Sequence, residues 1–209
     1  MRKNNKYLDP VNTPKEVKTE LARGLRILNA IDKPIVTFFG SARTPENDKY
    51  YTHANHVASE LGKRGFAVLS GGGPGIMQAA NSGAMKSQTE SIGFKAALLS
   101  KEKVQKHLYT HEGHFVYLFV RRFLLAIKSK AIILYPGGYG TLNELFEYLM
   151  LMQTKVLDRV PIICVGKKFW KGLDIWLKQV VLQNHMVDKV DLSMVHVVES
   201  EHEVLSMLK

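Results

Sequence analysis

The sequence predicts a single α/β domain built on a doubly wound parallel β-sheet with helices on both faces. Short apolar runs rich in β-branched and aromatic residues alternate with longer segments in which apolar residues recur at helical spacing. Three of the apolar runs, ending near positions 39, 70 and 135, lead directly into glycine-bearing turns. A length of 209 residues suits one domain of this kind with a sizeable core.

Residues 1–33 are predicted to form a basic segment and an amphipathic helix, ahead of the domain proper at 34–209. Residues 13–16, TPKE, have the form of a capping box with proline at the first helical position. The residues that mark the apolar face of this helix are Val17, Leu21, Leu25 and Leu28. We expect that face to pack on the domain or on a second subunit. The basic start is not followed by the apolar segment of a secretory signal.

The rest of the chain alternates between predicted strands and predicted helices. The strands are expected at 35–39, 66–69, from 91, at 131–135, 161–165 and 195–198. The helices are expected at about 47–64, through 77–84, at 114–129, from 141, at 169–183 and at the C-terminus. Such alternation is typical of a Rossmann-like fold, in which ligands bind at the carboxyl ends of the strands near a topological switch point. All three glycine-bearing turns fall at such ends.

Residues 136–144, PGGYGTLNE, join the predicted strand at 131–135 to the helix that follows. At such a turn, backbone N–H groups and the positive end of the helix dipole converge on an anion. The glycines let a phosphate approach the backbone, and Thr141 adds a hydroxyl at the expected helix start. Glu144 lies one turn into the helix and faces whatever is attached to the phosphate. We interpret the stretch as a phosphate-binding turn with a carboxylate directed at a sugar.

Other phosphate-binding motifs fit less well. The chain has no Walker A sequence, so P-loop NTPase chemistry has no support. Residues 71–76, GGGPGI, begin like the GxGxxG fingerprint of dinucleotide-binding proteins, but Ile76 stands where the third glycine belongs. In the turn at 136–144, Asn143 stands at the position of that third glycine. NAD or FAD binding is therefore disfavoured. The glycines at 71–75 could also serve only to let a strand and a helix pack closely.

Composition narrows the class of protein further. The formal charge of +10 at pH 7 suits either contact with a nucleic-acid backbone or the steering of small anions toward a cleft. The basic residues are scattered and no nucleic-acid-binding signature is present, so polynucleotide binding is disfavoured. No apolar run approaches the roughly 18 residues that span a bilayer, so no membrane association is expected. The single cysteine, Cys164, excludes an internal disulfide and is interpreted as a buried strand residue. We expect a cytoplasmic protein.

Three histidines, His107, His111 and His114, recur at the spacing of one helical face, where they could hold a metal. The zincin pattern is absent, and the stretch beside Gly113 has weak helical character. We therefore expect no metal site.

Two glycine-bearing motifs together resemble the LOG family, often misannotated as lysine decarboxylases. The first is GGGPGIM at 71–77, and the second is PGGYGTLNE at 136–144, of the form PGGxGTxxE. FGSAR at 39–43 and the region 153–170 are similar to the bacterial branch of that family. The resemblance runs from about position 35 to position 176, and two long motifs in the correct order are more specific than either alone.

The resemblance implies a nucleoside 5′-monophosphate phosphoribohydrolase, which hydrolyses the N-glycosidic bond of AMP-like nucleotides to a free base and ribose 5-phosphate without a cofactor. Family members include cytokinin-activating enzymes and bacterial nucleotide nucleosidases. The family's catalytic arginine falls on Arg121, fifteen residues before Pro136, and its glutamate falls on Glu144. Arg122 stands where the family usually has lysine, and Leu118 where plant-type members have a methionine lining the base pocket. Catalysis is therefore better supported than base preference.

In this interpretation the turn at 136–141 holds the 5′-phosphate, with help from the two other glycine-bearing turns. Glu144 contacts the ribose and stabilises positive charge developing at the anomeric carbon, while Arg121 positions Glu144 and the substrate. The predicted substrate-binding residues are Ser41, Gly72, Gly73, Arg122, Gly137, Gly138, Tyr139, Gly140 and Thr141.

A non-catalytic nucleotide sensor on the same fold is the alternative, since fold does not determine chemistry. The presence of both Arg121 and Glu144 argues for hydrolysis, because a sensor has less use for that pair. Taken without the motif, Glu144 could simply favour the first turn of a helix, and Arg121 and Arg122 could be surface charges. The resemblance also implies a homodimer or a higher homo-oligomer, with sites near the subunit interface.

Overall fold

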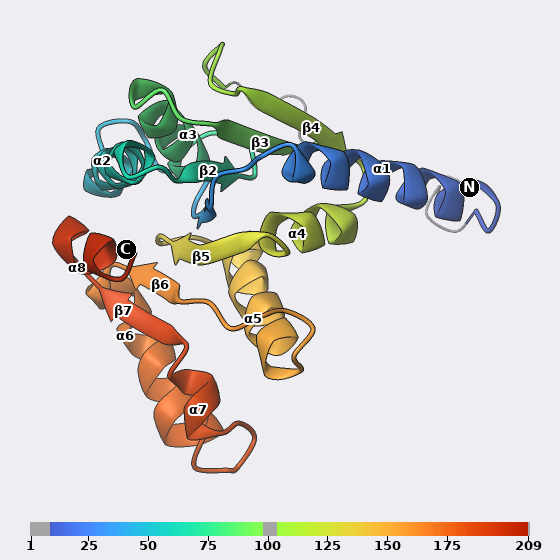
Figure 1. Cartoon of the computed structure of the whole chain (residues 1–209). Helices are drawn as coiled ribbons and strands as arrows, with labels where there is room; N and C mark the ends of the chain where they lie inside the picture. The colour runs from blue at the N-terminus through green and yellow to red at the C-terminus, as the bar shows by residue number, and fades with distance from the viewer. Residues whose placement is uncertain (1–8, 98–103, 209) are drawn as a thin grey trace, which may run out of the picture.

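The computed structural model describes residues 9–97 and 104–208 and confirms the doubly wound parallel sheet (Figure 1). Its seven strands are ordered β4-β3-β2-β1-β5-β6-β7, and all of them are parallel. The strands are β1 (Ile35–Phe39), β2 (Ala67–Ser70), β3 (Ser91–Ala96), β4 (His111–Phe115), β5 (Ser129–Leu134), β6 (Ile162–Val165) and β7 (Val195–Val198). The helices are α1 (Asn12–Asn29), α2 (Lys49–Lys63), α3 (Ile76–Lys86), α4 (Leu118–Ala126), α5 (Tyr139–Gln153), α6 (Lys167–Trp176), the π-helical turn η3 (Leu177–Val181), α7 (Lys189–Leu192) and α8 (Glu201–Ser206).

The order of the strands reverses between β1 and β5. From β1 the chain moves outward through β2 and β3 to β4, and it then crosses back so that β5 pairs with the free side of β1. Val36 therefore pairs with Val68 on one side and with Ala131 on the other. The carboxyl ends of β1, β2 and β5 flank this switch point, which is where open parallel sheets bind ligands.

Helices cover both faces of the sheet and form two apolar clusters with it. Helices α1, α4, α5 and α6 contribute to one cluster, and α2, α3 and α8 contribute to the other (Figure 1). Along β1, Ile35 and Phe39 belong to the first cluster, whereas Val36 and Phe38 belong to the second. Burial on both faces explains why such strands are continuous apolar runs in the sequence. Cys164 is buried on β6, as predicted.

The N-terminal helix α1 packs its predicted apolar face on the domain. Leu28 is buried in the first cluster, and three further residues of this face pack against it. These residues are Val17, Leu21 and Leu25. The predicted basic segment lies largely in residues 1–8, outside the described residues.

The predicted capping box at the start of α1 is wrong. The helix begins at Asn12, so Thr13 and Pro14 both lie inside its first turn. The carboxylate of Asp9 accepts hydrogen bonds from the backbone N–H groups of Val11 (2.9 Å) and Asn12 (3.0 Å). An upstream aspartate thus satisfies donors at this helix start, where the missing N–H of proline costs little.

Strand β4 was not predicted, and the helix expected at 114–129 begins only at Leu118. The sequence HEGHF has no apolar run to mark a strand at the edge of a sheet. Its buried face is formed by Gly113 and Phe115, and the Phe115 ring packs on that of Phe94 with centroids 5.0 Å apart. Contacts with β3 and α1, which are distant in sequence, therefore stabilise this strand.

Candidate functional site

The three glycine-bearing turns lie together at the carboxyl edge of the sheet, joined through Ser41. The N–H of Ser41 donates to the carbonyl of Pro136 (3.0 Å), and its own carbonyl accepts from the N–H of Ile76 at the start of α3 (3.2 Å). The Ser41 hydroxyl oxygen accepts from the N–H of Arg43 (3.0 Å). Gly75 has φ +66°, and a side chain there would overlap the Ser41 carbonyl. Glycine at this position thus permits the close approach of two turns.

The turn before α5 presents bare backbone at a helix N-terminus. The first hydrogen bond of this helix runs from the N–H of Leu142 to the carbonyl of Gly138 (3.0 Å), so earlier N–H groups point out of the helix end. Gly138 and Gly140 are exposed, with open space where a Cβ would stand. Tyr139 is 94% exposed, and Thr141 is buried against Gly137.

Arg121 is held at the inner end of the site by backbone carbonyls. It lies on α4, where its Nε donates to the carbonyl of Phe94 (2.5 Å) and its Nη2 donates to the carbonyl of Gly71 (3.0 Å). A Cβ on Gly71 would overlap the same guanidinium. These contacts fix the position of the positive charge.

Glu144 and Glu147 lie one turn apart on α5 and have different environments. Glu147 forms an ion pair with Arg122, and both side chains are largely buried. Burial raises the pKa of Glu144 to about 8, although the charges of Arg121 and Arg122 act to lower it. The nearby charge of Glu147 adds to the rise. Glu144 is therefore mostly protonated at neutral pH and lies within electrostatic reach of Arg121.

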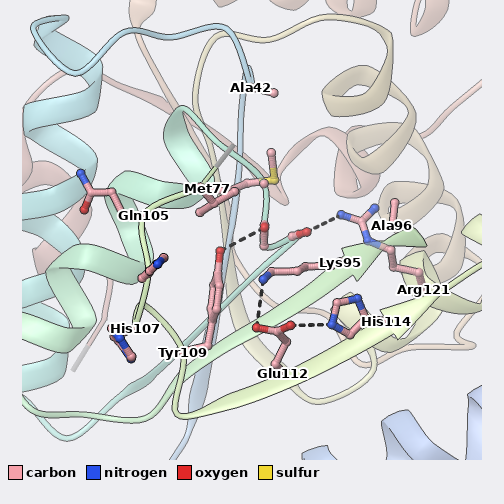
Figure 2. Close-up of a pocket in the computed structure, with 15 residues that line it drawn as sticks. Ala42, Met77, Lys95, Ala96, Gln105, His107, Tyr109, Glu112, His114 and Arg121 are labelled. Carbon is pink, nitrogen blue, oxygen red and sulfur yellow. Dashed lines mark hydrogen bonds and ion pairs between the residues drawn. The ribbon is translucent and has the colours of Figure 1, made fainter. Parts of the chain in front are cut away.

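A cavity of about 520 Å³ opens beside Arg121 (Figure 2). Its wall includes Arg121 and the turn at 71–73, together with Ala42, the neighbour of Ser41. Of the predicted site residues, Gly72, Gly73 and Arg121 line this cavity. The predicted residues that do not line it are Ser41, Arg122, Gly137, Gly138, Tyr139, Gly140, Thr141 and Glu144.

The turn at 71–73 directs its groups differently from our expectation. The N–H of Gly72 donates to the buried hydroxyl of Ser70 (3.0 Å), so this amide is already used within the protein. The carbonyl of Gly72 accepts from the hydroxyl of Tyr109 (3.0 Å). Gly72 therefore has a structural role in the turn, with φ +66°.

Lys95, Tyr109, Glu112 and His114 also line the cavity, and none of them was predicted to bind substrate. The ammonium of Lys95 pairs with Glu112 (2.9 Å) and lies 4.6 Å from the ring centroid of Tyr109. His114 contacts the other oxygen of the same carboxylate (2.5 Å), as Figure 2 shows. Partial burial acts to raise the pKa of Glu112, but hydrogen bonds from Lys95 and His114 outweigh it and lower the pKa. Only the pairing of β3 with β4 brings these residues together, and no local sequence pattern signals it.

The three histidines do not share one helical face. His111 and His114 lie on strand β4 at an odd separation, so they point to opposite faces of the sheet, and His107 lies in a turn with φ +60°. Across residues 9–97 and 104–208, no group of three or more His, Cys, Asp or Glu side chains could hold a metal. None of the helices described is both long and apolar enough to cross a bilayer.

The fold defines an α/β protein with a doubly wound parallel sheet and a cavity at the carboxyl edge of that sheet. The family model described as "Possible lysine decarboxylase" matches residues 77–208. The chain belongs to this family, the LOG family.

Two curated relatives from Arabidopsis thaliana support the assignment. The chain is 29% identical over 128 residues to "Probable cytokinin riboside 5'-monophosphate phosphoribohydrolase LOG6", covering 61% of this chain and 63% of the relative. It is 26% identical over 136 residues to "Cytokinin riboside 5'-monophosphate phosphoribohydrolase LOG5", covering 65% of this chain and 59% of the relative. The match thus spans less than two thirds of either relative.

Solved structures with the same fold are more distant in sequence. The molybdenum cofactor binding protein from Rippkaea orientalis superposes with a TM-score of 0.63 at 19% identity, covering 85% of this chain and 96% of that one. The molybdenum cofactor carrier protein from Chlamydomonas reinhardtii gives 0.59 at 18% identity, covering 83% and 94%. At these identities the likeness establishes the fold alone.

Proposed function

We propose that the protein is a nucleoside 5′-monophosphate phosphoribohydrolase, which hydrolyses the N-glycosidic bond of AMP-like nucleotides to a free base and ribose 5-phosphate. The observation that carries this proposal is the position of Arg121. It lines the 520 Å³ cavity, is anchored by two backbone carbonyls, and its charge acts on Glu144. The names of the two Arabidopsis relatives describe the same reaction class.

The substrate phosphate binds at the N-terminus of α5. The N–H groups ahead of Leu142 point out of the helix end, and Gly138 and Gly140 leave space for the phosphate oxygens. The hydroxyl of Ser41 and the backbone of Gly73 lie on the adjoining turns and complete the anion site. This position directs the ribose toward Glu144 and Arg121.

Glu144 acts in its ionised form. Its carboxylate stabilises the positive charge that develops at the anomeric carbon and accepts a proton from the attacking water. A pKa of about 8 makes it a stronger base than an ordinary carboxylate, and a base is most effective when its pKa lies near the working pH. The water oxygen bonds to the anomeric carbon as the bond to the base nitrogen breaks with its electron pair. The departing base then takes up a proton from solvent water, and Glu144 returns its proton to solvent. Arg121 keeps its proton and positions the carboxylate and the substrate.

The test is base release from a panel of AMP, GMP, CMP, UMP and a cytokinin riboside 5′-monophosphate, followed by chromatography. We expect free base from at least one of them and none from Glu144→Gln. Glu147→Gln is the matched control one turn along the same helix, and it should keep most of the turnover because Glu147 is engaged by Arg122. A fully active Glu144→Gln protein would contradict the assignment.

A second candidate is a nucleotide carrier or sensor without hydrolysis. Two observations favour it: Glu144 does not line the cavity, and the same fold occurs in molybdenum cofactor binding and carrier proteins. In that case the protein binds a nucleotide tightly in a calorimetric titration and releases no base from any member of the panel.

We also propose a homodimer or higher homo-oligomer. Large apolar side chains lie exposed on α4 and α5, including Phe119 (54% exposed) and Met150 (48%). Size-exclusion chromatography with light scattering tests this assembly, and a monomeric mass at micromolar concentration contradicts it.

A further inference from the structure

The groups of the proposed site are neighbours of one another. Glu144 lies in the first turns of α5, its pKa responds to the charge of Arg121, and Arg121 lines the 520 Å³ cavity. Ala42 lines that cavity, and its neighbour Ser41 bonds to Pro136 at the phosphate end. A nucleotide with its phosphate on α5 and its glycosidic bond at Arg121 therefore places its base in the cavity. The volume lies within the range of about 300–1,000 Å³ that is usual for small-molecule sites.

Strands β3 and β4 give one wall of the cavity a defined chemistry. Glu112 pairs in register with Gly93, and His114 pairs with Lys95, so these four residues share one face of the sheet. A Cβ on Gly93 would meet the ring of Tyr109 at about 2.5 Å, so glycine there makes room for the tyrosine. The tyrosine hydroxyl is bound to the Gly72 carbonyl, which holds its ring against this wall.

The wall presents a hydrogen-bond donor beside an anionic acceptor. Lys95 and Glu112 lie 2.9 Å apart, and their side chains are 28% and 37% exposed. Lys95 has three N–H donors. Each oxygen of Glu112 already takes part in one hydrogen bond, with Lys95 (2.9 Å) or with His114 (2.5 Å), and keeps a further lone pair. The carboxylate can therefore accept two parallel hydrogen bonds from one ligand edge. The complementary ligand edge carries an acceptor followed by two donors.

Guanine has this edge: its O6 is an acceptor, and its N1–H and 2-amino groups are adjacent donors. Hypoxanthine lacks the second donor, uracil replaces it with an acceptor, and adenine and cytosine each offer only one donor group there. We propose that the cavity is the nucleobase subsite and that Lys95 and Glu112 select guanine nucleotides. This inference rests on the proposed function, because the phosphate end and Arg121 set the direction of the substrate.

The experiment compares GMP with IMP, which differ only in the 2-amino group. Dissociation constants are measured by calorimetry in the full-length Glu144→Gln protein, so that no turnover disturbs the titration. We expect GMP to bind about tenfold more tightly than IMP, since a hydrogen bond to a charged group is worth about 1.5–3 kcal/mol, or roughly 10- to 150-fold. Adding Glu112→Gln should abolish that ratio and leave the affinity for ribose 5-phosphate unchanged.

Two further variants separate recognition from general damage. Glu90→Gln is the matched control, because it breaks the similarly exposed Lys33–Glu90 pair (2.7 Å) just before β3, outside the cavity. It should keep the GMP preference. Lys95→Met should weaken GMP and IMP equally, because both carry O6, and so it provides a second test if Glu112→Gln does not fold.

The outcomes distinguish this inference from the proposed function. Equal affinity for GMP and IMP overturns guanine selection, whether or not the wild-type protein releases bases. A loss of ribose 5-phosphate binding in Glu112→Gln also overturns it, because the carboxylate then acts on the phosphate end. A GMP preference that depends on Glu112, without base release by the wild-type protein, supports the subsite and refutes the hydrolase.

Discussion

Replacing Glu144 with glutamine should stabilise the protein at alkaline pH and leave its stability almost unchanged at pH 5. Burial raises the pKa of Glu144 from 4.5 to about 8, so the folded protein keeps a proton that the unfolded chain releases between those values. The stabilising advantage of the bound proton is complete below pH 4.5 and is lost as the pH rises through 8. This pKa difference is worth at most about 5 kcal/mol, at about 1.4 kcal/mol for each tenfold change in proton affinity.

The Glu144 side chain is only partly buried, so solvent screening reduces this value, and we expect about 1–3 kcal/mol at pH 9. Glutamine has a similar shape and cannot ionise, and it therefore avoids the cost of an ionised carboxylate in this position. The assay is urea unfolding of both proteins at pH 5, 7 and 9, followed by circular dichroism. The variant should gain stability relative to the wild type as the pH rises. A difference that stays constant from pH 5 to 9 would refute the reasoning, because ionisation of Glu144 would then cost nothing.

Three further predictions follow from the same contacts. The kcat/KM of the wild-type protein should rise with pH and level off above about pH 8, because Glu144 must be ionised; initial rates that fall over this range contradict the base role. Arg121→Lys should lower kcat by about 100-fold and leave the circular dichroism spectrum unchanged. An ammonium cannot bond both the Phe94 and Gly71 carbonyls in the planar geometry of a guanidinium. Turnover at the wild-type rate would contradict this prediction. Gly71→Ala should lower the melting temperature, because the added Cβ would overlap Arg121. Gly138→Ala should leave the melting temperature unchanged, because the added Cβ would meet open space. Equal melting temperatures for the two variants would show that the Gly71 turn can adapt.

The parts of the fold that could be predicted from the sequence are those in which local pattern and tertiary burial agree. Strand β1 has the predicted bounds, 35–39, because it is fully buried and is therefore a continuous apolar run. Strand β7 also has the predicted bounds, 195–198, although it is an edge strand that is only partly buried. Helix α6 begins two residues before the predicted 169–183 segment, which then continues as the π-helical turn η3. Helix bounds were less accurate because the residue that starts or ends a helix depends on caps and packing.

The residues of the candidate site also differ in whether a local sequence pattern could identify them. The turn before α5 and Glu144 lie on consecutive residues, so a motif could identify them. Lys95 and Glu112 are 17 positions apart, and the pattern HEGHF around Glu112 does not mark a strand. Their contact depends on the register of β3 with β4, which is set by burial of Phe94 and Phe115 on the opposite face. A local reading of the sequence therefore could not identify this wall of the cavity.

Two glutamates on α5 differ in how their carboxyl groups are paired. Glu147 forms an ion pair with Arg122, whereas the described residues provide no hydrogen bond or ion pair to Glu144. Arg121 lies near enough to affect the pKa of Glu144, but backbone carbonyls of β3 and of the Gly71 turn hold its guanidinium. A carboxyl placed for stability alone would take the nearest guanidinium as its partner. Glu144 lies near two arginines without a hydrogen bond or ion pair from the described residues, and we therefore expect this carboxyl to contact a ligand, since local violations of packing rules concentrate at functional sites.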